Sequence, residues 1–176
     1  MNRRLMLAAG FGILLLAVAS PFFEALTSPS TNASGAIVWM SFDEGVLKAQ
    51  RENKKILIDV FTDWCGWCKK MDKDTYPDEA VRSAIDKHFV AIKLDAESEK
   101  KVTFRGQKMT QIAFAQSAGA TSYPSTLFLD EKLKPISLLP GYMTPERFSP
   151  ILLYIGEGHY LTTKFPDYLA KQRNRS

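Results

Sequence analysis

Cys65 and Cys68, the only two cysteines of the chain, lie in the run Trp-Cys-Gly-Trp-Cys. Such a C-x-x-C pair can close a disulfide and can open it again by exchange with another thiol. The run follows an apolar segment, 56–61, and has no strand pattern of its own, so we expect it to begin a helix. Unpaired N–H groups and the positive end of the dipole at a helix start lower the pKa of a cysteine there. We therefore predict that Cys65 is the nucleophile and Cys68 the resolving thiol.

Other uses of a cysteine pair fit this chain less well. A structural zinc site takes about four ligands, and only His88 and His159 could join the cysteines. Attachment of a c-type haem requires a histidine directly after the second cysteine, where this chain has Lys69. A purely structural disulfide gains little stability from so short a loop. We predict no metal and no cofactor other than the redox-active disulfide Cys65–Cys68.

Asp59 is the single charged residue in the apolar segment Ile56 to Phe61, which has the pattern of a central strand covered on both faces. Burying a carboxylate is unfavourable unless it is protonated or serves a purpose. Desolvation would raise the pKa of Asp59, which suits a group that exchanges a proton with Cys68. The strand could instead twist so that Asp59 reaches solvent, and both possibilities remain open at this point.

Aromatic residues and a proline could surround the cysteine pair. Trp64 and Trp67 flank the cysteines, where they could dock a substrate or simply pack against the fold. Tyr123-Pro124 immediately precedes a predicted strand over 125–129. A proline belongs at the first position of a strand, and the bond before it could be cis or trans.

Hydrophobic periodicity predicts the elements that must position these residues. The polar stretch from 96 to 108 is expected to be an exposed loop or irregular insertion. The order of elements predicts an α/β sheet that begins parallel and ends in an antiparallel hairpin. The predicted elements are helices near 42–52, 65–71, 77–88, 109–119, 144–156 and 166–172, and strands over 56–61, 89–94, 125–129 and 136–139.

The N-terminal segment has the pattern of an export signal, with Arg3 and Arg4 before an apolar run from 5 to 19. Small residues at 17–19 favour cleavage, whereas the apolar stretch that continues beyond them is long enough for a membrane anchor. The predicted organisation is a signal peptide or membrane anchor over 1–26, a flexible linker over 27–36, and one domain with a C-terminal helical extension over 37–176.

The chain has 176 residues, of which 45% are hydrophobic, and a formal net charge of +4. This composition suits a single globular domain, which we expect to be a monomer. The excess positive charge lies largely at the two ends of the chain, so we predict no nucleic-acid surface. Contact with a membrane is expected only through the N-terminal segment, if that segment is not cleaved.

Several of these runs resemble the thioredoxin family, and within it the exported bacterial thioredoxin-like proteins related to SoxW and to the C-terminal domain of DsbD. The segments 55–61 and 63–69 are similar to the family's strand, buried acid and active-site motif, in register. Lys93 falls where thioredoxins keep a lysine near the buried acid. The run 123–126, Tyr-Pro-Ser-Thr, is similar to the family's cis-proline loop. The resemblance covers about 37–156.

The resemblance implies a thioredoxin fold, with a central mixed sheet flanked by helices. It implies that Asp59 is the proton-handling acid and that Lys93 supports it. It also implies that Pro124 is a cis-proline that guides an extended substrate segment. Around Pro124, the expected substrate-binding residues are Trp64, Gly66, Trp67 and Tyr123.

The implied activity is reduction of protein disulfides in the cell envelope, by a periplasmic or exported protein that could be anchored in the inner membrane. Because that compartment is oxidising, the dithiol would need a membrane thiol-reducing electron donor. Trp67 replaces the proline usual in cytosolic thioredoxins, and residues between the cysteines tune the redox potential. A disulfide oxidant or isomerase and a redox-inert binding module therefore remain as alternatives.

Overall fold

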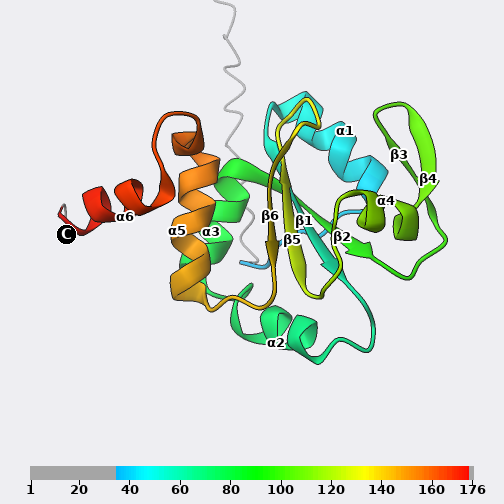
Figure 1. Ribbon diagram of the computed structural model, residues 1–176, viewed down its shortest axis with the longest axis horizontal. Helices are drawn as coiled ribbons and strands as arrows, with labels where there is room; N and C mark the ends of the chain where they lie inside the picture. The colour runs from blue at the N-terminus through cyan, green and yellow to red at the C-terminus, as the bar shows by residue number, and fades with distance from the viewer. Residues whose placement is uncertain (1–34, 175–176) are drawn as a thin grey trace, which may run out of the picture. The chain divides into compact units, whose positions relative to one another are not determined.

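The structure is a computed structural model that describes residues 35–174 (Figure 1). The predicted signal or anchor segment, 1–26, and nearly all of the predicted linker, 27–36, lie outside the described residues. Between 35 and 174, no helix is both long enough and apolar enough to cross a membrane.

The central sheet of the described region is mixed and has the strand order β2-β1-β5-β6. Strand β1 (Lys55–Phe61) pairs in parallel with β2 (Phe89–Asp95) and antiparallel with β5 (Ser125–Leu129). Strand β6 (Pro135–Pro140) then pairs antiparallel with β5. Because β1 is central and covered on both faces, its inner residues are all buried, which explains its nearly continuous apolar sequence. The predicted sheet, with a parallel beginning and a final hairpin, is confirmed.

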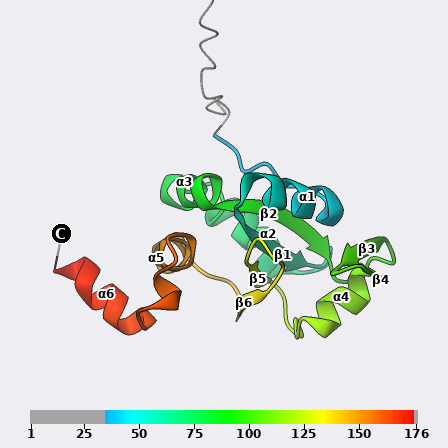
Figure 2. The same cartoon turned by 90° about the horizontal axis from the view of Figure 1, so that it is seen from above.

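Helices cover both faces of the sheet (Figure 2). Helices α1 (Phe42–Glu52) and α4 (Gln111–Ser117) pack on one face, and α3 (Glu79–His88) and α5 (Pro145–Gly156) pack on the other. The alternation of side chains along β1 separates the two cores. Its even-numbered residues face α1 and α4, whereas its odd-numbered residues face α3 and α5.

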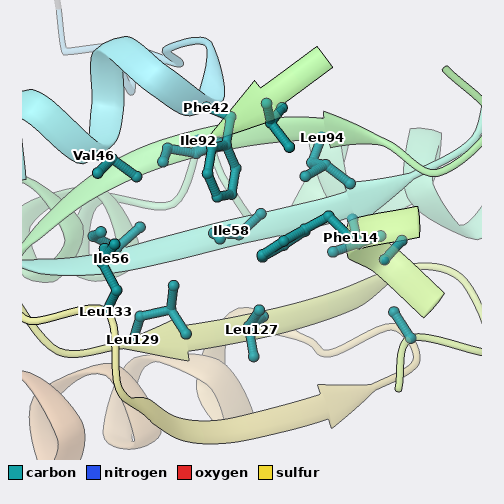
Figure 3. Packing of buried hydrophobic residues seen from close by; sticks show 14 of the residues in the cluster. Phe42, Val46, Ile56, Ile58, Ile92, Leu94, Phe114, Leu127, Leu129 and Leu133 are labelled. Atoms are coloured by element: carbon teal, nitrogen blue, oxygen red, sulfur yellow. The ribbon is translucent and has the colours of Figure 1, made fainter. Parts of the chain in front are cut away.

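The core under α1 and α4 is built from aliphatic residues of the sheet and from aliphatic and aromatic residues of the helices (Figure 3). Phe42 of α1 packs edge-on against Phe114 of α4, with ring centroids 4.7 Å apart. Ile58 of β1 lies close to these rings in Figure 3, and Ile56 and Ile58 are both fully buried. This close packing makes β1 a rigid support for the residues at its end.

A hairpin replaces the predicted loop over 96–108, and that prediction is wrong. Strands β3 (Lys101–Phe104) and β4 (Gln107–Thr110) pair antiparallel, and α4 begins at Gln111 rather than at 109. The turn residues, Arg105 and Gly106, both have positive φ, as a two-residue type I′ turn requires. Val102 is only 3% exposed because it enters the core under α1. Each strand has only four residues, and the remaining apolar residues, Phe104 and Met109, are only partly buried, so the pattern in the sequence is weak.

Strand direction places four connections at the same end of the sheet. The carboxyl ends of β1, β2 and β6 and the amino end of β5 all lie there. Helix α2 (Gly66–Asp74), which follows β1, is seen at this end in Figure 1. The segment before β5 and the connection between β6 and α5 therefore lie beside the start of α2.

The C-terminal extension packs on α5 through aromatic residues. It consists of a 3-10 turn (His159–Leu161) and helix α6 (Phe165–Arg173), so the predicted terminal helix is present. The ring of Tyr154 on α5 lies 5.1 Å from that of Phe165, between centroids, and its hydroxyl donates to the Thr163 carbonyl at 2.6 Å.

Candidate active site

Cys65 is the N-cap residue of α2, as the sequence predicted for a cysteine at a helix start. Its sulfur accepts a hydrogen bond from the Cys68 backbone N–H at 3.0 Å. The two sulfurs form a disulfide with an S–S distance of 2.13 Å. The same N–H group and the positive end of the helix dipole would stabilise a thiolate on Cys65 after reduction. The site therefore has the electrostatics of an attacking thiol.

Three residues around the cysteines, Trp64, Gly66 and Trp67, are open to solvent. Trp64 is 67% exposed and Trp67 is 58% exposed, so these rings do not simply pack against the fold. Gly66 lies between them, and a Cβ built on it would meet no atom within 4 Å. Cys65 and Cys68 are themselves 4% and 3% exposed. The buried disulfide is thus flanked by exposed indole rings and an open glycine.

The first tryptophan is held by residues from two other connections. Trp64 packs edge-on against Tyr123, with ring centroids 6.1 Å apart. Its indole N–H donates to Glu97 Oε1 at 2.9 Å. Tyr123 precedes β5 and Glu97 follows β2, so the segments gathered at this end of the sheet meet around Trp64.

The second tryptophan contacts a residue that the sequence analysis missed. Trp67 lies 5.4 Å from Tyr142, between ring centroids, with the planes tilted by 38°. The Lys70 ammonium lies 5.5 Å from the Tyr142 ring centroid. Tyr142 belongs to the connection between β6 and α5, and no motif marks it in the sequence. Only the arrangement of strands brings it to the cysteine pair.

The peptide bond between Tyr123 and Pro124 is cis, which resolves the choice that the sequence left open. The Pro124 carbonyl accepts a hydrogen bond from the Gly141 backbone N–H at 2.7 Å. Gly141 has a φ of 85°, a conformation that favours glycine. This bond joins the proline loop to the segment that carries Tyr142.

Asp59 is 1% exposed, so the alternative in which it reaches solvent is excluded. It is the Cα partner of Lys93 across β1 and β2 and of Thr126 across β1 and β5. Its Oδ2 atom accepts from Lys93 Nζ at 2.5 Å, whereas Oδ1 has no hydrogen-bond partner among the described residues. Burial raises the pKa of the Asp59 carboxyl, and the nearby Lys93 ammonium partly opposes that rise.

Lys93 also contacts a second carboxylate, that of Asp72 on α2, at 2.5 Å. Asp72 is half exposed, so the Lys93 ammonium joins a buried acid to one at the surface. Tyr76, which follows α2, is buried beside them, and burial together with Asp59 raises the pKa of its hydroxyl well above the ordinary value. Neither Asp72 nor Tyr76 was predicted as part of the site.

Metal binding finds no support in the arrangement of these residues. Over the described part of the chain, no group of three or more histidine, cysteine, aspartate or glutamate side chains is placed to hold an ion. His159 is instead 3.0 Å from Glu157 in the C-terminal extension.

Comparison with known proteins identifies the domain. Residues 42–156 match the family model described as a thioredoxin-like domain. An uncharacterised protein of Caenorhabditis elegans is 32% identical over 107 residues, which are 60% of this chain and 14% of that protein. The thiol:disulfide interchange protein DsbD of Pseudoalteromonas atlantica is 28% identical over 110 residues, 61% of this chain and 17% of DsbD. The chain thus spans less than a fifth of the length of these relatives.

A solved structure extends the similarity to three dimensions. A thioredoxin-fold protein from Helicobacter pylori superimposes with a TM-score of 0.61 at 28% sequence identity. The match covers 71% of this chain and 88% of that one. The predicted thioredoxin fold is therefore confirmed, and the chain belongs to the thioredoxin-like domain family.

Proposed function

We propose that this chain is a thiol–disulfide oxidoreductase that reduces disulfides of proteins in the cell envelope. The observation that carries the proposal is the Cys65–Cys68 disulfide at the start of α2, where the Cys65 sulfur accepts the Cys68 N–H. A reversible disulfide whose first sulfur lies at a helix N-terminus is the arrangement that dithiol exchange needs.

The reaction begins from the reduced dithiol. The Cys65 thiolate attacks one sulfur of a substrate disulfide, which forms a mixed disulfide and releases the other substrate sulfur as a thiolate. The Cys68 thiolate then attacks the Cys65 sulfur, which closes the disulfide seen here and releases the second substrate thiol. Two electrons pass from the dithiol to the substrate, and two protons accompany them.

Asp59 is the proposed acceptor of the Cys68 proton, and Lys93 supports it. The carboxylate lies near the carboxyl end of β1, six residues before Cys65, and is shielded from water. Lys93 bonds the other oxygen, Oδ2, so Oδ1 is the oxygen that we expect to take the proton. Because burial raises its pKa, this carboxyl can bind a proton at a pH where an exposed aspartate cannot.

The substrate segment is proposed to bind across Trp64, Gly66, Trp67, Tyr123 and Pro124. The exposed tryptophans provide apolar contact on either side of Cys65, and the open Gly66 lets a chain approach the buried sulfur. The contact between Trp67 and Tyr142 adds a second aromatic pair to that between Trp64 and Tyr123. An extended polypeptide with apolar residues beside its cysteine fits this surface.

The proposed location is the periplasm or another exported compartment. The export pattern in the first 26 residues supports it, and an uncleaved segment would anchor the chain in the inner membrane. A dithiol working as a reductant in an oxidising compartment is itself oxidised in each cycle. A membrane protein that supplies thiol reducing equivalents is therefore the proposed partner.

The reduction potential of the Cys65–Cys68 pair tests the direction of the reaction. The full chain is equilibrated with buffers of defined thiol/disulfide ratio, and the reduced fraction is counted by alkylation and mass spectrometry. A potential near about −270 mV, as in thioredoxin, supports a reductase. A potential near about −120 mV, as in DsbA, would instead show an oxidant.

Two alternatives have specific observations in their favour. Trp67 stands between the cysteines in place of proline, a change that can raise the potential towards an oxidant or isomerase. The exposure of Trp64 and Trp67 would also serve a redox-inert module that docks a partner on this face. A Cys65→Ser variant that keeps the biological function would favour the binding module over either enzyme.

A further inference from the structure

The Lys93 side chain is enclosed by more than its two carboxylate partners. Three aromatic rings surround the ammonium group, at distances from Nζ to the ring centroids of 4.7 Å for Trp39, 5.2 Å for Phe61 and 5.3 Å for Tyr76. We call these three rings the lysine cage. Trp39 is the closest of them, and an indole attracts a cation more strongly than the other rings do.

Backbone pairing beside β2 sets the position of Trp39. The next residue, Met40, donates its N–H to the Ala91 carbonyl at 3.0 Å, and its carbonyl accepts the Lys93 N–H at 3.2 Å. Met40 therefore continues the sheet beyond β2, in a parallel bridge with Ile92. Because side chains alternate along such a segment, Met40 joins the core under α1 and Trp39 faces the opposite side, with Lys93.

Trp39 also contacts Tyr76, another ring of the lysine cage. The Trp39 and Tyr76 rings meet edge-on, with centroids 4.8 Å apart. Tyr76 is buried, so this contact gives Trp39 a fixed support. Phe61, Tyr76 and Lys93 all lie inside the region that matches the family model, 42–156, whereas Trp39 lies before it. Trp39 is thus the one ring of the lysine cage that lies outside the matched region.

We propose that Trp39 is a positioning residue for the buried acid: its ring holds the Lys93 ammonium against Asp59 and Asp72. The role in proton exchange rests on the proposed function, whereas the positioning of Lys93 does not. A lysine side chain is long and flexible, and without a wall its ammonium gains hydration by turning towards water. Asp59 would then be left buried without its counter-charge.

Two carboxylates and one tyrosine hydroxyl lie around the Lys93 ammonium. Asp59 comes from β1, Asp72 from α2, and the Tyr76 hydroxyl from the segment after α2. Arg82 of α3 lines a pocket together with Trp39, Asp72 and Tyr76, and its guanidinium bonds the Gly35 carbonyl. Lys93 is therefore the cation in direct contact with Asp59, and its displacement should change the titration of that carboxyl.

The test is a pH titration of the Asp59 side-chain carboxyl by carbon NMR, in the oxidised full chain, where the cysteines do not titrate. In Trp39→Leu we expect the midpoint to rise by about one pH unit, because an opposite charge within a few ångströms has been lost. Trp39→Phe keeps an aromatic wall and should restore most of the wild-type midpoint. Phe104→Leu, which removes a ring from the opposite core, should leave the midpoint unchanged.

The proposal is overturned if the Asp59 midpoint in Trp39→Leu matches the wild type, or if Trp39→Phe shifts it as far as Trp39→Leu. If Trp39→Phe shifts the midpoint as far as Trp39→Leu, an aromatic ring at position 39 is not enough to hold the Lys93 ammonium. If Trp39→Leu gives no folded amide spectrum, Trp39→Met takes its place with the same expectation. The titration needs no turnover, so a wild-type chain without thiol exchange would refute the proposed function and leave this test intact.

Discussion

The indole N–H of Trp64 donates a hydrogen bond to Glu97 at 2.9 Å, although Trp64 is 67% exposed. Glu97 lies in the connection between β2 and the β3–β4 hairpin, the stretch that the sequence marked only as an insertion. Its own backbone N–H donates to the Asp95 carboxylate at 2.9 Å, which fixes the start of the connection. The insertion therefore orients one wall of the proposed substrate site.

Removal of the Glu97 acceptor should weaken substrate binding without changing the chemical step. In Glu97→Ala we expect KM for a disulfide-bonded peptide to rise about threefold, the cost of one hydrogen bond, with kcat unchanged. Glu97→Gln keeps a side-chain carbonyl that can accept the same bond and is the matched control. Steady-state kinetics give both constants, and equal damage from the two variants would contradict the role given to this bond.

Tyr142 should contribute to binding through its contact with Trp67. Tyr142→Ala leaves Trp67 without its aromatic neighbour, so we expect KM for a substrate with an aromatic residue beside its cysteine to rise about threefold to tenfold. Tyr142→Phe keeps the ring and should behave as the wild type. A peptide with serine in place of that aromatic residue provides the comparison. An equal rise in KM for both peptides would show that Tyr142 does not select substrates with an aromatic residue beside the cysteine.

Asp59 should make the stability of the domain depend on pH. Its folded pKa is raised by burial, so the folded state holds the proton more tightly than the unfolded chain does. The stabilisation from protonated Asp59 is complete below the unfolded pKa, near 3.8, and is lost as the pH rises through the folded value. At neutral pH the buried Asp59 carboxylate therefore lowers the free energy of unfolding of the wild type.

The Asp59→Asn variant carries no such charge and should become more stable than the wild type as the pH rises. Urea unfolding at pH 4 and pH 7 should show the advantage of Asp59→Asn growing by about 1.4 kcal/mol for each unit of pKa shift. A constant difference between Asp59→Asn and wild type at both pH values would disprove the raised pKa.

The parts of the site that could be predicted are those that local sequence determines. An N-cap cysteine needs only the strand before it and the helix after it, and both have clear patterns. Asp59 was identified because a charge in a fully apolar strand is costly and so is informative. Lys93 and the role of Pro124 came from resemblance to a family, since nothing in their local pattern distinguishes them.

The parts that could not be predicted depend on contacts between distant segments. Tyr142 follows a strand end and Trp39 precedes the first helix, and each acquires a partner only when the sheet forms. The β3–β4 hairpin was missed because only Val102 and Phe104 of β3 point to the core, which is too short an alternation to recognise.

Trapping of a mixed disulfide tests the central claim, that Cys65 attacks substrate disulfides and Cys68 resolves the product. Reduced Cys68→Ser is mixed with a protein that has one accessible disulfide, and the products are separated without reductant. We predict a covalent complex whose peptide map places the link at Cys65, and none with Cys65→Ser. Absence of the complex with Cys68→Ser, or an equal yield from Cys65→Ser, would contradict the account.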